Sequence, residues 1–375
     1  MFLIERLVGL GIYCYFLAAT CLLIAFSKIK LKNIAKFYTL ALAVMGFFYE
    51  PYKTADLYRI NESLHQFSNY TFSGFFNTFV KNSSVPAARI YYWLISKTGV
   101  FELLPAVTCI ICYSCIFYAI VRAAEIYKID RKSIAVAVFF FMSTGNYIMV
   151  ISNIRTMLAI SLIFFCMFRE TVEKKYRPAD ILLYVIAAFT HNIAMIIIAI
   201  RMIVIVFNRK TPLIKRLALV AVFAVAAVFM VARFGNIFNS IFEKAMSYIT
   251  EGGYSYIWDY IVGVLAFLIE LIVLIRCFKS KKDCSELVSM NIFLTLCTGI
   301  ALVFCYEFSI FHRFTVYISP VLCLAQLMFC MKPKNEKKVV LGVIHLRDFV
   351  FIISAAMLIL ACMRGSLCSL KFFVL

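Results

Sequence analysis

Charged residues, and acidic residues in particular, are scarce in this chain of 375 residues. Only 15% of the residues are charged, with 19 Asp and Glu against 38 Lys and Arg, whereas 64% are hydrophobic. A soluble globular domain carries charge on roughly a quarter of its residues. The composition therefore excludes an ordinary soluble domain and predicts a membrane protein with several apolar spans.

The motifs of nucleotide-using and hydrolytic enzymes are also lacking. The chain contains no nucleotide-binding loop, no zinc ligand set and no serine elbow, which argues against a cytosolic enzyme that uses nucleotides. Cys109, Cys112 and Cys115 imitate a metal motif, but they have no accompanying histidine and lie in an apolar stretch, so they indicate packing. Residues 7–26 lack a convincing cleavage site and are long enough to span, so we expect a first membrane helix there.

The positive charge occurs in short clusters between apolar stretches. A net charge of +19 could indicate nucleic acid, but this clustering is typical of cytoplasmic loops. If the basic clusters are placed in the cytoplasm, successive apolar stretches cross the membrane in alternating directions. This arrangement predicts about twelve transmembrane helices, with both termini on the external side. The predicted fold is therefore all-α, a single polytopic membrane domain over residues 1–375.

Two longer polar segments are predicted on the external side, over residues 50–99 and 233–259. In the first, apolar side chains share one face of a helix, which predicts an amphipathic helix at the membrane interface. These side chains are Leu57, Ile60, Leu64 and Phe67. The second segment carries aromatic side chains that form either an interfacial belt or a platform for sugar rings. They are Tyr254, Tyr256, Trp258 and Tyr260.

An arginine, Arg155, interrupts the apolar stretch over residues 134–168. Basic clusters on both sides predict a hairpin that turns near residues 145–153, which places Arg155 near the external end of the returning helix. If Ser152 or Asn153 caps that helix, its first N–H groups and the guanidinium would bind an anion. The helix rises only about 22 Å, against roughly 30 Å of hydrocarbon, so we place Arg155 in a protein-lined cavity. The alternative is a surface arginine that snorkels.

Two further hairpins bring titratable residues to the same external side. The first, over residues 181–206, has His191 near its tip, although a single span with His191 at its centre is an alternative that the charge rule disfavours. The second, over residues 287–331, has Glu307, His312 and Arg313 at its tip. Several arginines suit a diphosphate, and a histidine or carboxylate beside them could accept a proton from a hydroxyl. In the structural alternative, His191 hydrogen-bonds a neighbouring helix, and Glu307 and Asp56 pair with Arg313 and Arg59.

Four short motifs together resemble the EpsG-like group of Wzy-type polysaccharide polymerases. They are Asp56-Leu57-Tyr58-Arg59, Ser152-Asn153-Ile154-Arg155 followed by Leu158-Ala159, Ala188-Phe189 with His191, and His312-Arg313-Phe314 with Tyr317. The resemblance implies a GT-C-like glycosyltransferase of the bacterial cytoplasmic membrane with its active site facing the periplasm or exterior. Undecaprenyl-diphosphate-linked repeat units would be donor and acceptor, and a chain-length regulator a further partner. No cofactor, metal or nucleic acid is implied.

The resemblance also assigns roles to residues. Arg155, Arg313 and Arg89 would bind the diphosphate, and His191 or Glu307 would be the base for the acceptor hydroxyl. The residues expected to hold the sugars are Asp56, Tyr58, Arg59, Asn153, His312 and Tyr317. An O-antigen ligase-like transferase would use the same donor, and an acyltransferase acting on surface sugars is a further alternative. A flippase would need polar groups along a path through the membrane, and the spans offer little besides Glu270.

Overall fold

The computed structural model describes residues 2–53, 55–175, 177–207, 257–279, 288–305, 307–332, 338–340, 344–363, 367 and 370–372. Nearly all of them are helical, which confirms the all-α prediction. The first half contains α1 (Phe2–Phe26), α2 (Leu31–Phe47), α3 (Asp56–Ser68), α4 (Phe72–Phe75), the π-helix η1 (Phe76–Val80), α5 (Pro86–Ser96), α6 (Leu103–Tyr127), α7 (Arg131–Ser143), α8 (Asn146–Ser152) and α9 (Ile154–Thr171).

The second half continues the helical bundle. It contains α10 (Pro178–Thr190), α11 (Asn192–Phe207), α13 (Ile257–Lys279), α14 (Val288–Val303), α15 (Phe308–His312), the π-helix η2 (Arg313–Ile318), α16 (Ser319–Leu322), α17 (Leu324–Cys330) and α18 (Leu346–Met363). Within the described ranges, strands occur only as the short antiparallel pair of β1 (Lys338–Val340) and β2 (Ile344–His345).

Four helices are long and apolar enough to cross a membrane, namely α1, α6, α13 and α18, and two bent helix pairs raise the number to six. This is the architecture of an integral membrane protein. The described residues do not show the predicted twelve or so spans, because α10, α11 and α14 have at most 16 residues. At 1.5 Å per residue such helices fall short of roughly 30 Å of hydrocarbon. One of the apolar stretches counted among the twelve predicted helices, residues 217–231, lies outside the described residues, as do residues 233–256 of the second polar segment.

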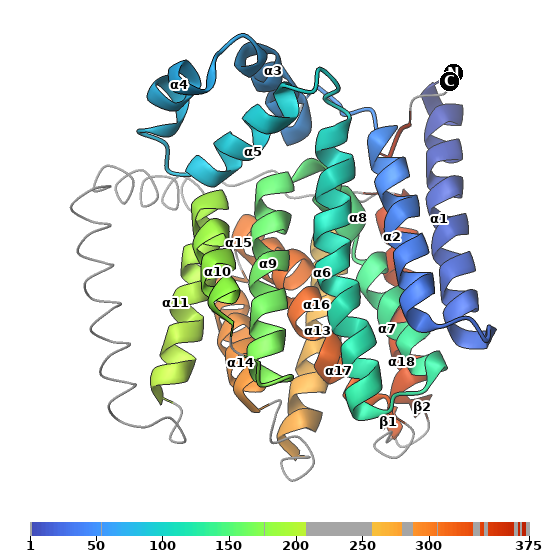
Figure 1. Ribbon diagram of the computed structural model, residues 1–375. Coiled ribbons are helices and arrows are strands. Elements are labelled where there is room, and N and C mark those ends of the chain that lie inside the picture. The colour runs from blue at the N-terminus through green and yellow to red at the C-terminus, as the bar shows by residue number, and fades with distance from the viewer. Residues whose placement is uncertain are drawn as a thin grey trace.

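Helices α3, α4, η1 and α5 form a unit, here called the cap (residues 56–96), that lies across one end of the bundle (Figure 1). The apolar face predicted for α3 is confirmed, because its buried residues are Leu57, Ile60, Leu64 and Phe67. This apolar face packs against other helices of the cap. The Phe67 ring packs 5.0 Å from the ring of Phe75 and 4.9 Å from that of Phe79, and α3 also contacts α5.

The predicted turn near residues 145–153 is confirmed, and it contains a short helix. Gly145 adopts a left-handed conformation with φ 79°, which separates α7 from α8. The two helices meet at an angle of 53°, and together they are long and apolar enough to form one broken span. Helix α9 then begins at Ile154 and runs back through the centre of the bundle, where it packs against α6. The start of α9 therefore lies at the cap end (Figure 1).

The basic connections lie together at the end opposite the cap. These are the turns between α1 and α2, α6 and α7, and α9 and α10 (Figure 1). The chain beyond α18 returns to the cap end, where the Glu50 N–H donates to the Lys371 carbonyl at 3.0 Å. Gly9 of α1 allows this return, because a Cβ there would lie 2.7 Å from the Leu370 carbonyl oxygen. The cap end and the basic end of the bundle are thus separate surfaces.

Candidate functional site

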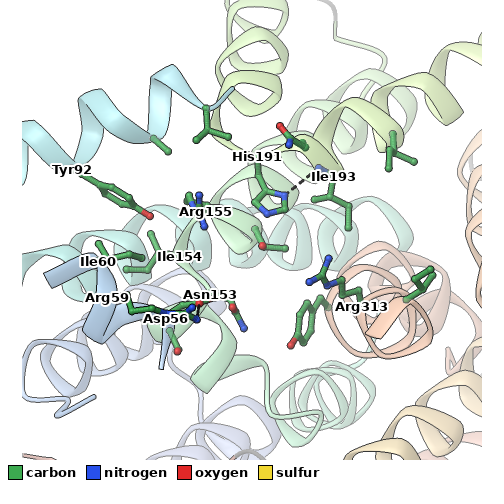
Figure 2. A pocket seen from close by; sticks show the side chains of 18 of the residues that line it. Asp56, Arg59, Ile60, Tyr92, Asn153, Ile154, Arg155, His191, Ile193 and Arg313 are labelled. Carbon is green, nitrogen blue, oxygen red and sulfur yellow. Dashed lines mark hydrogen bonds and ion pairs between the residues drawn. The ribbon is translucent and has the colours of Figure 1, made fainter. Parts of the chain in front are cut away.

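A cavity of about 920 Å³ lies between the cap and the bundle, a size typical of a small-molecule site. Its wall combines segments far apart in the sequence: α3 and α5, the start of α9, the junction of α10 and α11, and the region of α14, α15 and η2. Its polar lining residues are Asp56, Arg59, Ser63, Arg89, Tyr92, Ser152, Asn153, Arg155, Thr156, His191, Asn192, Arg313 and Tyr317. Figure 2 shows Arg155, His191 and Arg313 around a common space.

The charged lining is strongly unbalanced towards positive. Among the described residues, four arginines line the cavity, Arg59, Arg89, Arg155 and Arg313, against the single carboxylate of Asp56. Asp56 forms an ion pair with Arg59. Burial and the nearby guanidinium of Arg155 lower the pKa of Arg89, so these two cations are close enough to repel each other. An anion in the cavity would relieve this repulsion.

The first turn of α9 adds backbone donors to this wall. Asn153, one of the two cap candidates from the sequence, occupies the N-cap position. Its side chain makes no capping hydrogen bond, and its Nδ2 instead donates to Met149 Sδ at 3.3 Å. The N–H groups of Ile154, Arg155 and Thr156 are therefore left at the cavity wall without a capping side chain. Among the described residues, no carboxylate forms an ion pair with Arg155. A helix start and a guanidinium at one place form an anion-binding arrangement.

His191 lies between α10 and α11 in an extended conformation, with φ −155° and ψ 138°. The two helices pack side by side with their junction at the cavity, which favours the predicted hairpin over a single span (Figure 1). The imidazole Nδ1 accepts the N–H of Ile193 at 3.1 Å. A neutral imidazole that accepts at Nδ1 carries its hydrogen on Nε2. In this arrangement the Nε2–H group can donate to an oxygen atom.

Arg313 and Tyr317 come from the π-helix η2, where the wider turn places both side chains at the cavity. π-Helical turns of this kind occur often at functional sites. Close packing holds η2 against α13, since a Cβ on Gly263 would lie 2.9 Å from Thr315 Oγ1. His312 precedes η2 but does not line the cavity. Its ring packs edge-on against Tyr317 with 5.2 Å between centroids.

The structure brings eight of the eleven predicted site residues to the cavity: Asp56, Arg59, Arg89, Asn153, Arg155, His191, Arg313 and Tyr317. Tyr58, Glu307 and His312 are not among the lining residues. Tyr58 lies on the opposite side of α3 from Asp56 and Ser63, because two residues advance a helix by about 200°. Glu307 is buried before the start of α15.

Sequence reasoning missed Tyr92, Thr156, Asn192 and the apolar part of the wall. Tyr92 had a usable signal, because it follows Arg89 by three residues on α5 and so shares its face. Its side chain is buried, and that burial raises the pKa of the Tyr92 hydroxyl. The apolar wall had no such signal, since apolar residues are abundant along the whole chain. Its residues include Ile193, Ile196, Ile300, Phe304, Ile310 and Phe314.

Metal ligands do not gather in the part of the chain that the structure describes. Within it, no group of three His, Cys, Asp or Glu side chains could hold a metal ion. The polar chemistry at the cavity is that of arginine, imidazole, carboxylate and backbone N–H.

Comparison with known proteins places the chain in a family. No curated protein and no solved structure matches it. A sequence model of the EpsG family, which is linked to exopolysaccharide biosynthesis, matches residues 89–364, well over half of the chain. The match includes Arg89, Arg155, His191 and Arg313, whereas Asp56 and Arg59 precede it. The chain therefore belongs to the EpsG family.

Proposed function

We propose that this protein is a membrane glycosyltransferase that polymerises undecaprenyl-diphosphate-linked oligosaccharide repeat units, as a Wzy-type polymerase of GT-C-like architecture. The observation that carries the proposal is the convergence of Arg89, Arg155, Arg313 and the start of α9 on one cavity. The growing glycan would pass from its lipid carrier to the non-reducing end of an incoming unit. Undecaprenyl diphosphate would leave.

The cationic part of the cavity suits the diphosphate of such a donor. Planar guanidinium groups bind phosphate oxygens through paired charge-assisted hydrogen bonds, and Arg155 and Arg313 approach from different helices. The N–H groups of the first turn of α9 add neutral donors. As the bond between the anomeric carbon and the diphosphate breaks, negative charge grows on the leaving oxygen. Donors already in place would stabilise that charge without reorganising.

The apolar part of the cavity suits the polyprenyl chain. Ile193 and Ile196 of α11 face the cavity together with Ile300 of α14 and Phe304, which directly follows α14. Ile196 is also exposed at the surface of the bundle. A charged head group and a hydrocarbon chain could therefore be held side by side, the head among arginines and the chain between α11 and α14. A water-soluble nucleotide sugar would leave this apolar wall without a partner.

Proton transfer in the proposed reaction is assigned from the hydrogen bond of His191. Because Nδ1 accepts from Ile193, Nε2 carries a hydrogen and cannot accept the proton of the acceptor hydroxyl in this tautomer. Glu307, the other predicted base, is not among the lining residues. Asp56 is the one carboxylate among the described lining residues, so we assign the base to Asp56 and a donor role towards the diphosphate to His191. The hydroxyl oxygen then bonds to the anomeric carbon as its proton passes to Asp56.

The proposed location is the outer side of the bacterial cytoplasmic membrane. The basic turns gather at the end of the bundle opposite the cap, and basic loops stay in the cytoplasm. The cavity at the cap end would then open towards the periplasm or exterior, where lipid-linked repeat units are available to a polymerase. A chain-length regulator remains a proposed partner.

The test is elongation by the purified protein in vesicles supplied with lipid-linked repeat units. We expect a ladder of products, its loss in Arg313→Ala and Asp56→Asn, and a ladder from Asp348→Asn, a control carboxylate on α18 away from the cavity. A deletion strain should leave single-unit glycan on the final acceptor. A strain with no glycan on that acceptor would instead indicate a ligase, and transfer of labelled units across the vesicle membrane without elongation would indicate a flippase.

A further inference from the structure

The cap exposes large apolar side chains on the side away from the cavity. Phe72 is 50% exposed, Phe76 is 40% exposed and Leu94 is 55% exposed. They come from three consecutive elements, α4, η1 and α5. Clustered exposed apolar side chains of this size indicate contact with a membrane or a partner.

Packed aromatic rings hold Phe72 and Phe76 in place. The Phe72 ring packs 5.1 Å from Trp93 and 6.0 Å from Phe76, and Phe75 stacks on Trp93 at 5.8 Å. Phe75 in turn packs on the fully buried Phe67. The exposed rings are thus the outer layer of a packed aromatic cluster and not isolated side chains.

Helix α5 separates the cavity from this apolar surface. Ala88, Arg89 and Tyr92 line the cavity. At 100° per residue, Leu94 points to the opposite side of the helix. One helix therefore presents a cation, Arg89, to the cavity and a large apolar side chain, Leu94, to the outside.

Charge around the surface matches anionic head groups. Residues 63–101 contain no Asp or Glu. Lys81 and Lys97 are both exposed, and the Lys97 Nζ lies 5.5 Å above the Trp93 ring and donates to the Ser68 carbonyl at 2.7 Å. Lysines and aromatic rings around apolar side chains are typical of segments that lie in a membrane interface.

The surface is also continuous with a membrane-crossing helix. Gly99, with φ 72°, turns the chain after α5, and α6 begins at Leu103 and is long enough to span. Val100 in this turn is exposed, as is Ile110 on α6. Only eight residues separate Leu94 from Leu103, so the cap surface lies where the chain enters the bilayer.

We propose that Phe72, Phe76 and Leu94 insert into the leaflet that α6 enters and anchor the cap in the lipid interface. The cavity beneath the cap would then open at the level of the lipid head groups. This assigns the membrane contact to α4, η1 and α5, and not to the apolar face of α3 that the sequence indicated, because other cap side chains already cover that face. The inference is independent of the reaction that the cavity catalyses.

The test uses the full chain with single tryptophans. The chain has two tryptophans, Trp93 and Trp258, and Trp93→Phe with Trp258→Phe gives the background. Phe72→Trp and Leu94→Trp report on the proposed surface, and Phe67→Trp is the matched control at a fully buried position of the same cap. Each variant is reconstituted in vesicles of phosphatidylcholine and phosphatidylglycerol, with and without bromine on the acyl chains near the head group.

Brominated lipid should remove most of the fluorescence of Phe72→Trp and Leu94→Trp and little of that of Phe67→Trp. Acrylamide in the water should quench all three weakly. The proposal is overturned if acrylamide quenches Phe72→Trp and Leu94→Trp while brominated lipid does not, which would identify a water-facing surface for a protein or glycan. Equal lipid quenching at all three positions would also overturn it, because the buried and exposed sides of the cap would then not differ.

Discussion

Helix α9 carries an arginine near each end, and the two arginines have opposite surroundings. Arg169, in the last turn, is only 7% exposed, and its Nη1 lies 2.7 Å from Asp180 Oδ1. Arg155, in the first turn, faces the cavity. A second cation, Arg89, lies close enough to repel it. One helix therefore holds a neutralised charge at one end and an unbalanced charge at the other.

The neighbours of Arg169 extend the difference between the two ends. Glu170 pairs with Arg201 at 3.1 Å, and Glu173 pairs with Arg122 at 2.6 Å. Carboxylates thus accompany arginines around the last turn of α9, whereas the described lining of the cavity combines four arginines with one carboxylate. Buried charge is costly unless it is paired. The ion pairs at the last turn of α9 stabilise the fold. The excess of positive charge at its first turn is explained if a bound ligand supplies the anion.

The largest effect is expected at the paired end. Arg169→Ala leaves Asp180 buried without its cation, which should lower the free energy of unfolding by about 3 to 5 kcal/mol. Chemical unfolding of the purified protein in detergent measures this loss. The control Arg59→Ala breaks an ion pair whose side chains are 67% and 42% exposed, so it should cost at most about 1 kcal/mol. Equal losses in the two variants would contradict the assignment of Arg169 to the fold.

A substitution at the cavity end of α9 should lower the elongation activity and leave the stability of the protein nearly unchanged. Arg155→Ala removes a donor to the diphosphate, so elongation should fall by about 10²- to 10³-fold, as when one preorganised donor is lost. Its unfolding free energy should stay close to that of the unaltered protein, because no described carboxylate is left unpaired. Elongation and unfolding are measured on the same preparation. A variant that unfolds easily and elongates normally would reverse the roles given to the two ends of α9.

The parts of the site that charge and helical periodicity specify could be predicted from the sequence. Basic clusters on both sides of the stretch around Arg155 indicated where the chain turns, and the same rule favoured a hairpin at His191. The spacing of Leu57, Ile60, Leu64 and Phe67 identified the buried face of α3. Each of these signals lies within a short stretch of sequence, so it can be interpreted without knowing which segment packs against that stretch.

Features that depend on which segment packs against a helix could not be predicted from the sequence. The apolar face of α3 indicates burial but does not distinguish lipid from protein, and Phe75 and Phe79 of later segments cover it. Motif adjacency likewise suggested Tyr58 and His312 for the site, but a neighbour in sequence points to another side of its helix. The bend of 60° within the last broken span and the π-helix that presents Arg313 arise from packing among several helices.

The smallest effect concerns the repulsion between Arg89 and Arg155. Arg89→Gln removes one of the two charges and keeps the stem of the side chain near the Phe67 ring, over which the guanidinium lies at 5.6 Å. The empty protein should become more stable by about 0.5 kcal/mol, the scale of interactions between partly exposed charges. Inorganic diphosphate should raise the midpoint of thermal unfolding less in this variant than in the unaltered protein, because a ligand stabilises only the state that binds it. Lys81→Gln, on the exposed side of the cap, is the control and should change neither quantity. An unchanged response of Arg89→Gln to diphosphate would remove Arg89 from the anion site and leave Arg155, Arg313 and the start of α9 to hold the ligand.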